Sequence, residues 1–535
     1  MRTFDSARRD LLRLSSMGLA ASAVTSLPAL AARKPAAPAL TPILFDVRAF
    51  GAMGDGKTVD SPAINKAIEA AAAAGGGTVV FPAGNYLSFS IRLKSHVDLY
   101  LSQGSAIVAA DSPLPNQTTG YMGGTYDAAE PKTAWDAYQD YGHNHWHNSL
   151  LWGDGISDFS ITGPGLIWGK GLSFGAGRAA RGNYPVYQAE QAGVGNKILG
   201  LKNCHNVTLR DFSMLKGGHF AILVTGVDNL TIDNLKIDTD RDAMDIDCCK
   251  NVRVSNCTVN SPWDDGIVPK SSFALGFAKP TENMNITNCY VSGCWELGTV
   301  LDGTYKRRPN GGTGRIKFGT ESNGGFKNIT ISNCVFEGCG GLALETVDGA
   351  LLDDFAVTNI TMRDINTSPI FLRLGARLRG PADSTKVGTL RRVLISNLSS
   401  YNTPSHYSSI LSGIPGYFIE DVKLSQIYIQ HAGGATADST RIQVPEYENK
   451  YPGPSMFGPT PSSGFYLRHL KNIEMSHVEL APVAPDPRPS FTLEDVHRAD
   501  FIAITAPSTP PAFSINKSSD VRILMSRAAP DSTTP

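Results

Sequence analysis

Asn206-Val207-Thr208, Asn229-Leu230-Thr231 and Asn251-Val252-Arg253 are copies of one short pattern, spaced 23 and 22 residues apart. Similar tripeptides follow at longer intervals, as expected where loops are inserted, and begin at Asn285, Asn328 and Asn359. Each copy opens a short strand in which apolar and polar residues alternate, and Gly or Asn residues typical of turns come after it. The repeat therefore predicts short strands about 22 residues apart, with no helices between them.

Short strands at this period cannot bury a hydrophobic core alone, but the stacked coils of a solenoid can. Leucine-rich repeats have a similar period but show Leu-x-x-Leu-x-Leu, which is absent here, and propeller blades need about 40 residues. The sequence thus predicts an all-β fold, a right-handed single-stranded parallel β-helix, as one domain over residues 44–525. An Ala-rich segment at 61–74 begins with Ser61-Pro62 and ends before Gly75, as helices do. We expect this helix to cap the N-terminal end of the solenoid.

The two ends of the chain differ from the repeats. Residues 1–32 are typical of an export signal, because Arg8-Arg9 precedes an apolar stretch at 14–27 and small residues near Ala31 form a cleavage pattern. The paired arginines favour a twin-arginine signal, with an ordinary secretory signal as the alternative. No later apolar run reaches ~18 residues, so we expect no stable membrane insertion and an exported protein, periplasmic or secreted. The composition of 526–535 predicts a disordered tail.

Composition limits the partners. The formal net charge of -1 gives no overall attraction to nucleic acid, so none is expected as a partner. Cys257, Cys289 and Cys334 recur at one place in the repeat, which predicts a buried stack of cysteines rather than metal ligands. Disulfides to the nearby Cys294 and Cys339 are the alternative. We expect no cofactor, no metal ion and a monomer.

Aspartates gather where the repeat is most regular. Asp240-Arg241-Asp242 is followed by Asp264, 22 residues after Asp242, and by Asp265. Because this interval equals the repeat, Asp242 and Asp264 are expected at equivalent places on adjacent coils, which lie about 4.8 Å apart. Like charges this close raise at least one pKa, and cleavage of a glycosidic bond needs an acid on one side and a base or nucleophile on the other. The group is a candidate catalytic site; a surface cluster or a Ca²⁺ site is the alternative from spacing alone.

At these residues the chain resembles glycoside hydrolase family 28, the pectin-degrading polygalacturonases and rhamnogalacturonan hydrolases. Asp240-Arg241-Asp242 keeps the last residue of the family's Asn-Thr-Asp motif, Trp263-Asp264-Asp265 keeps both aspartates of Gly-Asp-Asp, and Lys270 matches the lysine that follows. The similarity extends from about residue 44 to 480. The resemblance implies that Asp264 is the general acid, that Asp242 and Asp265 hold and activate water, that Lys270 binds substrate, and that the configuration is inverted in one displacement.

Two other motifs of that family are missing. The family's Gly-His-Gly corresponds to Gly312-Thr313-Gly314, and its Arg-Ile-Lys corresponds to Ala343-Leu344-Glu345. The string Arg315-Ile316-Lys317 lies one coil too early to be the missing motif. In polygalacturonases the lost residues help bind the galacturonate carboxylate. The resemblance therefore implies a hydrolase of pectic, galacturonate-containing polysaccharide that cleaves unbranched polygalacturonate poorly.

Other residues are candidates to replace the lost ones. Arg315, Lys317 and Arg373 are expected to hold a substrate carboxylate at a shifted position, because the arginine fork matches a carboxylate. His219, one coil before the aspartates, is expected to line the same cleft, with a simply packed histidine as the alternative. Glu345 is expected to face the substrate and to repel its carboxylate.

Other functions stay open because one fold hosts several activities. A rhamnogalacturonan or other pectin side-chain hydrolase would use the same aspartates. A β-helix polysaccharide lyase would need a base to abstract a proton and a group to neutralise the uronate, and its products would absorb in the ultraviolet. A non-catalytic carbohydrate-binding solenoid would release no reducing ends.

Overall fold

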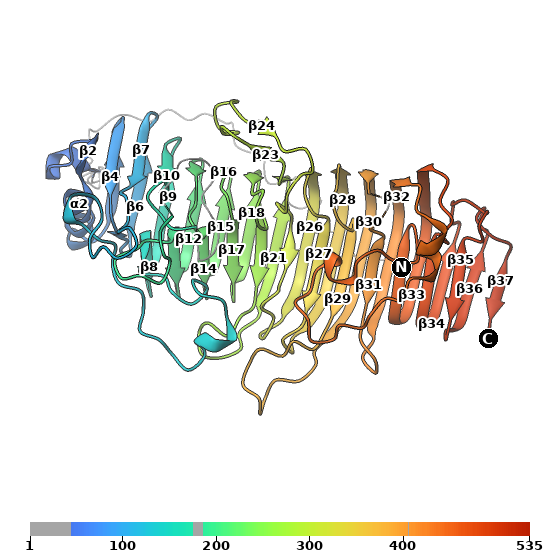
Figure 1. The fold of residues 1–535 in the computed structure, drawn as a ribbon. Coiled ribbons are helices and arrows are strands. Elements are labelled where there is room, and N and C mark those ends of the chain that lie inside the picture. The colour runs from blue at the N-terminus through green and yellow to red at the C-terminus, as the bar shows by residue number, and fades with distance from the viewer. Residues whose placement is uncertain (1–43, 175–185, 405) are drawn as a thin grey trace, which may run out of the picture. The chain divides into compact units, whose positions relative to one another are not determined.

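A computed structural model describes residues 44–174, 186–404 and 406–535 of the chain (Figure 1). These residues form successive coils whose strands pair in parallel with those of the coils before and after them. The prediction of an all-β parallel β-helix is confirmed. The prediction of an export signal falls on residues 1–32, which lie outside the described residues.

Each coil contributes strands to three faces. The first face, which carries the candidate site, contains β5 (Ile91–Arg92), β8 (Ser149–Asp154), β11 (Lys197–Lys202), β14 (Phe220–Thr225), β17 (Asp242–Asp247), β20 (Ile267–Lys270), β25 (Lys317–Phe318), β27 (Leu342–Thr346), β29 (Ile370–Leu374) and β31 (Ser409–Ser412). A bridge between Ile267 and Ile316 joins the β20 and β25 parts of this face.

The second face contains β1 (Leu44–Asp46), β3 (Gly77–Phe81), β6 (Val97–Leu101), β9 (Ser157–Thr162), β12 (His205–Arg210), β15 (Asp228–Asp233), β18 (Lys250–Ser255) and β21 (Thr281–Thr287). The third contains β2 (Asp55–Val59), β4 (Gly84–Ser88), β7 (Ser105–Ala109), β10 (Leu166–Trp168), β13 (Ser213–Leu215), β16 (Lys236–Asp238), β19 (Thr258–Asn260) and β22 (Tyr290–Ser292). Later coils are built on long strands: β26 (Phe326–Glu337), β28 (Leu351–Arg363), β30 (Thr389–Thr403), β32 (Ile419–Gly433), β33 (Phe465–Ala484) and β34 (Phe491–Ile502). Since β26 pairs with both β21 and β22, one long strand now spans two faces.

Asparagines at the start of the second face form a ladder of side-chain hydrogen bonds. Asn229 donates to Asn206 over 2.8 Å, and Asn328 donates to Asn283 over 2.9 Å. All of them have positive φ, which Asn adopts more readily than most residues. The repeated Asn is thus explained by a left-handed turn that its side chain also stabilises.

Two of the predicted repeat positions are wrong. Met284 pairs with Val252, so the ladder position after Asn251 is Asn283, two residues before the predicted Asn285. Asn359 belongs to a different turn, where it donates to Asn333 over 3.1 Å. The tripeptide pattern could not separate the two turns, because both place Asn before an apolar residue.

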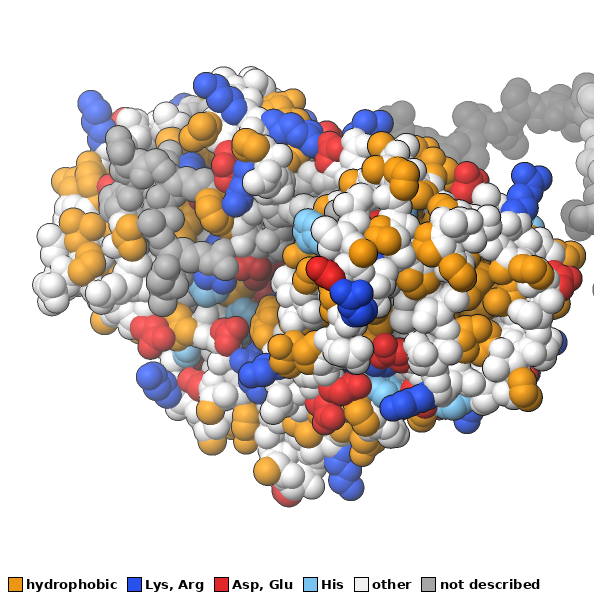
Figure 2. Space-filling model, turned by 45° about the vertical axis from the view of Figure 1, so that its right-hand side comes forward, with side chains coloured by type: hydrophobic (Ala, Val, Ile, Leu, Met, Phe, Trp, Pro, Cys, Tyr) orange, Lys and Arg blue, Asp and Glu red, His pale blue; other side chains and the backbone are white. Residues whose placement is uncertain are grey.

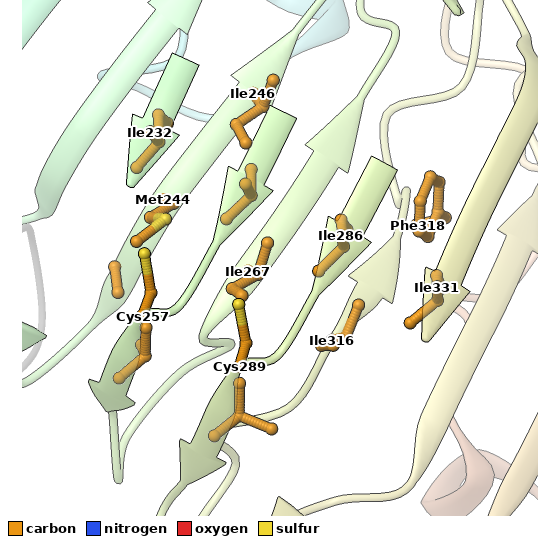
Figure 3. Close-up of a cluster of buried hydrophobic side chains, with 14 of the residues drawn as sticks. Ile232, Met244, Ile246, Cys257, Ile267, Ile286, Cys289, Ile316, Phe318 and Ile331 are labelled. Atoms are coloured by element: carbon orange, nitrogen blue, oxygen red, sulfur yellow. The ribbon is translucent and has the colours of Figure 1, made fainter. Parts of the chain in front are cut away.

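The interior is filled by aliphatic side chains and cysteines from all three faces (Figure 3). Cys257 and Cys289 point into it beside Met244, Ile267 and Ile286. All eight cysteines are buried and free, as the predicted stack requires.

We expect a reducing agent to leave the thermal unfolding midpoint unchanged, because no disulfide constrains the unfolded chain. Thiol titration with Ellman's reagent in denaturant, without prior reduction, should give all eight thiols. Fewer thiols, or a midpoint that falls by several degrees in reductant, would contradict this assignment.

Helix α2 (Ser61–Ala73) covers the N-terminal end of the coils. Its face of Ile64, Ala67, Ile68 and Ala71 is fully buried. The helix starts at Ser61 as predicted, but Asp60 is its N-cap, and the Ser61 hydroxyl accepts a hydrogen bond from the Phe89 amide instead. Short 3-10 helices occur in loops: η1 (Val47–Phe50), η2 (Tyr121–Gly123), η3 (Asp136–Tyr138), η4 (Ala437–Arg441) and η5 (Pro454–Phe457).

The C-terminal end is also covered. Strands β35 (Phe513–Asn516) and β36 (Ser519–Leu524) complete the last coil, and β37 (Ser532–Thr534) pairs with β36 in antiparallel orientation. The prediction that residues 526–535 form a disordered tail is therefore wrong. The open edge of β36 offers main-chain hydrogen-bond partners to this segment, and composition does not reveal them. A hairpin of β23 (Trp295–Glu296) and β24 (Lys306–Arg307) projects from the coils. No helix among the described residues is long and apolar enough to cross a membrane.

Candidate active site

Asp242, Asp264 and Asp265, here called the aspartate triad, come together on the first face. Asp242 begins β17, and Asp264 and Asp265 precede β20. Oxygens of all three carboxyl groups lie within 4.8 Å of one another. Because Met244 pairs with Ile267, the register sets Asp242 opposite Asp265. The predicted equivalence of Asp242 with Asp264 is thus wrong by one residue, although the predicted proximity is correct.

One main-chain amide links the triad. The Asp265 N–H donates to Oδ1 of both Asp242 and Asp264, each over 3.1 Å. The Asp264 side chain is 22% exposed and accepts from the Arg241 guanidinium over 3.2 Å. Asp242 and Asp265 are buried. Asp264 is therefore the most exposed member of the triad.

Asp265 is held as a carboxylate. Arg315 Nε donates to its Oδ1 over 2.8 Å, and Lys317 Nζ lies 3.1 Å from its Oδ2. Burial alone would raise the pKa of Asp265, but the charges of Lys317 and Arg315 outweigh it and lower that pKa to about 2. We expected Arg315 and Lys317 to hold a substrate carboxylate. Instead, both side chains bind the carboxylate of Asp265.

Burial outweighs the neighbouring positive charges at two carboxyl groups of β17. It raises the pKa of Asp242 well above its ordinary value, and the nearby charge of Asp264 adds to this. It also raises the pKa of Asp245 to about 8, against the opposing charge of Lys270. Asp242 and Asp245 thus keep their protons to higher pH than ordinary aspartates, while Asp265 loses its own at low pH.

Lys270 lies behind the triad instead of facing a ligand. It is buried, donates to Glu321 over 2.9 Å and lies 3.9 Å from Asp245. Burial would lower the pKa of Lys270, but Asp245 and Glu321 outweigh it and raise that pKa. Glu321 also accepts from Arg379 over 2.6 Å, which ties in the loop after β29. The predicted role of Lys270 in substrate binding is not what this geometry favours; Lys270 neutralises buried carboxylates.

His219 is placed among aromatic rings. It is buried, stacks on Phe220 with ring centroids 4.3 Å apart, and lies 6.3 Å from the ring of His143. It does not line the groove described next. His219 is therefore a packed histidine, the alternative considered from the sequence, and does not line the cleft.

An open groove of about 850 Å³ passes over Asp264 and Asp265. One side is formed by the segment 308–313 after β24, and the other by residues 451–456. Trp263 and Tyr451, 40% and 58% exposed, present rings to it. Arg308 lies over the Trp263 ring, 4.4 Å from its centroid. On the face that Figure 2 shows, basic and acidic side chains are interspersed.

Arg373 does not reach the groove but supports one of its walls. This buried side chain donates to the carbonyls of Glu446 and Tyr447 over 2.9 and 3.1 Å. The buried Arg468 donates to the two carbonyls before them. Both arginines thus anchor the loop 434–464, which carries Tyr451. The predicted contact of Arg373 with substrate is corrected to this anchoring role.

Glu345 is also placed differently from the expectation. It is fully buried, with Oε2 3.9 Å from Lys317 Nζ. It therefore faces the cation behind Asp265 and not a ligand in the groove. Thr313 lines the groove where a histidine was expected from the resemblance. The neighbouring Gly314 has φ +38°, and a Cβ there would lie 2.0 Å from the Ser292 carbonyl, so only glycine fits.

Two groups of side chains are close enough to share a cation. One is the aspartate triad, and the other is His143, Asp242 and Asp245. In the first, Arg315 and Lys317 already contact Asp265; in the second, Lys270 lies 3.9 Å from Asp245. A metal ion would sit beside these positive charges, so the residues present fit ion pairs better than a metal site.

Comparisons with known proteins agree with this architecture. Residues 44–115 match the family model "Rhamnogalacturonase A/epimerase, pectate lyase-like", and residues 196–364 match "Right handed beta helix region". A family 28 exopolygalacturonase of Yersinia enterocolitica has a similar structure, with a TM-score of 0.60 and 17% identity over 85% of this chain and 78% of that one. The chain shares the right-handed β-helix fold of this exopolygalacturonase.

The relatives that match in sequence carry different names. A probable polygalacturonase of Vitis vinifera is 23% identical over 255 residues, 44% of this chain and 46% of its own length. Mannuronan C5-epimerase AlgE1 of Azotobacter vinelandii is 60% identical over 45 residues, 8% of this chain. The matches thus span less than half of the plant relative and 3% of the epimerase.

Several residues of the site were missed in the sequence. Asp245 had a signal, since Asp245 and Asp247 alternate with the apolar Met244 and Ile246, as on a strand with one face in the core. Glu321, Tyr451 and His143 had none that we recognise. They reach the site from loops distant in the sequence, whose paths the repeat does not predict.

Proposed function

We propose that this chain is an inverting glycoside hydrolase that cleaves pectic polysaccharide. The observation that carries the proposal is the meeting of three carboxyl groups within 4.8 Å of one another beside one groove, with Asp265 bound by two cations. Those cations lower the pKa of Asp265 to about 2, whereas burial raises the pKa of Asp242. A carboxylate that can accept a proton thus lies beside carboxyl groups that can supply one, as cleavage of a glycosidic bond needs. The pectic substrate is supported by the likeness to the plant polygalacturonase and the rhamnogalacturonase model.

In the proposed reaction Asp264 is the general acid, as the family resemblance implies, and it is the most exposed member of the triad. Its proton passes to the glycosidic oxygen as the bond to the anomeric carbon breaks. Water attacks that carbon from the opposite side and gives a proton to the Asp265 carboxylate. Asp242, within 4.8 Å of both, orients the water and can return a proton to Asp264 after each turnover.

The predicted inversion rests on the family resemblance, because the triad oxygens lie closer than the ~6.5–9.5 Å usual for inverting enzymes. We expect the first product to carry the anomeric configuration opposite to that of the cleaved bond. Proton NMR during the first minutes of hydrolysis measures this before mutarotation. Retention of configuration would refute the proposal, since it demands a covalent intermediate on one aspartate.

The class of reaction is tested with a panel of pectins that includes rhamnogalacturonan and unbranched polygalacturonate. A hydrolase releases reducing ends without new absorbance in the ultraviolet. A lyase produces unsaturated ends that absorb, and a non-catalytic carbohydrate-binding solenoid releases no ends. Either of the last two results overturns the proposal.

We propose further that the protein acts as a monomer outside the cytoplasm. The features that support export are Arg8-Arg9 and the apolar stretch after them. A polymeric substrate also requires that its hydrolase be exported, because polysaccharides do not enter the cytoplasm intact. Fractionation of cells that express the full chain, with an Arg8-Arg9→Lys-Lys variant as control, tests the location and the route.

A further inference from the structure

We infer that the sugars on both sides of the cleaved bond are uncharged, because the protein's own carboxylates occupy the cations that a uronate would need. The inference rests on the proposed glycosidase function and narrows its substrate. It would make the chain an enzyme for neutral stretches or side chains of an acidic polysaccharide. The charges around the triad, the groove beyond it and the exposed rings carry the argument.

Two cations beside the triad are already neutralised. Arg315 and Lys317 bind opposite oxygens of Asp265 over 2.8 and 3.1 Å, and Glu345 lies 3.9 Å behind Lys317. Two positive charges thus face two negative ones, all buried. A uronate carboxylate that bound Arg315 or Lys317 would compete with Asp265 and Glu345 for their positive charge, and weaker pairing would leave a buried carboxylate poorly compensated.

The other described cations of the groove are paired as well. Arg241 binds Asp264 over 3.2 Å, and Arg308 lies 3.5 Å from Glu296. A second hollow of about 790 Å³ adjoins the groove and shares Asn310, Gly311, Asn366 and His406 with it.

In that second hollow, Arg307 binds Glu337 over 2.9 Å and also contacts Asp364. Burial lowers the pKa of His406, which favours its neutral ring. Among the described residues, each lysine or arginine along the groove and the adjoining hollow therefore has a carboxylate of the protein within 4.0 Å.

Exposed rings provide what a neutral sugar needs. Trp263 lies directly before Asp264, and Tyr451 lies on the opposite wall, where its hydroxyl accepts from Lys317 over 3.2 Å. The ring faces can pack against the apolar C–H faces of pyranoses, and such contacts need no charge on the sugar. Because Arg373 and Arg468 anchor its loop, Tyr451 is held in place before any sugar binds.

The test uses each pectic polysaccharide in two forms, native and with its uronate carboxyl groups chemically reduced to alcohols. Reducing-end release is measured at pH 7.5 for both forms, and the sugars at the new ends are identified by mass spectrometry. We expect neutral sugars at both new ends, and kcat/KM on the reduced form equal to or above that on the native form. Uronates at the new ends, with kcat/KM at least tenfold lower after reduction, would overturn the inference while leaving the glycosidase intact. No release from any form would instead refute the proposed function itself.

A variant tests the charge balance directly. Glu345→Gln removes one of the two carboxylates around Lys317 and leaves a net positive charge beside the triad. The measured quantity is the ratio of two inhibition constants, that of digalacturonate and that of its carboxyl-reduced counterpart. We expect this ratio to fall at least about tenfold in the variant, because the loss of a nearby buried negative charge favours a bound carboxylate. Glu282→Gln, which removes the partner of Lys250 on the second face, is the matched control and should leave the ratio unchanged. An unchanged ratio in Glu345→Gln would contradict the assignment.

Discussion

Asp264→Asn is expected to lower kcat/KM by 10²- to 10⁴-fold while the fold stays intact, because an amide cannot protonate the leaving oxygen. The side chain is the triad member exposed to the groove, and its partner Arg241 can still bind an amide oxygen. The core packing of the coil should therefore be unaffected. Hydrolysis rates on the best substrate of the panel, together with the thermal unfolding midpoint, measure both effects.

The control for this variant is Asp98→Asn, which removes a carboxylate of similar size from the second face. Asp98 accepts from the Ser160 hydroxyl over 2.7 Å and lies on β6, away from the groove. It should keep full activity. Activity of Asp264→Asn close to that of the unchanged protein would mean that another group is the acid.

Arg315→Met is expected to move the acidic limb of the pH profile of kcat/KM upward by roughly 1–3 pH units, the range over which one cation shifts a nearby carboxyl. Arg315 helps to lower the pKa of Asp265 to about 2, so its removal raises that pKa. The Asp265 carboxylate is protonated, and can no longer act as a base, as the pH falls through its pKa. The activity of the variant should therefore fall further below that of the unchanged protein as the pH is lowered. At pH 4 we expect activity up to about tenfold below that of the unchanged protein, the limit for a shift of about three units, and at pH 7 a much smaller difference.

Lys317 remains next to Asp265 in this variant and limits the shift. Arg253→Met, at an exposed position of β18, is the control and should leave the profile in place. The thermal midpoint is measured at each pH, so that unfolding in acid is not mistaken for loss of the base. An acidic limb that does not move would show that Asp265 does not act as the base.

The sequence predicted the fold and the triad because both depend on the repeat. Asn206, Asn229 and Asn251 mark a turn in which Asn has a physical advantage, and their spacing places Asp242 beside Asp264 and Asp265. The register was wrong by one residue at Asp264, since the coil there has one more residue than the interval between the asparagines suggested.

The surroundings of the triad could not be predicted in the same way. The partners of Arg315 and Arg373 depend on contacts between coils and on the path of the loop 434–464. Charge and side-chain type made both arginines candidates for binding a uronate. Only their positions show that one neutralises Asp265 and that the other holds a loop. The sequence contains no information on distance that would have separated these roles.

The anchoring of the loop 434–464 separates two tasks within one chain. The triad lies at positions fixed by main-chain pairing between coils, whereas Tyr451 is presented by an insertion held through side-chain contacts to carbonyl groups. Because Arg373 and Arg468 bind main-chain oxygens there, the side chains of the insertion that face the groove can change without loss of these bonds. The wall of the groove could thus be altered at the insertion while the triad stays where pairing between coils places it.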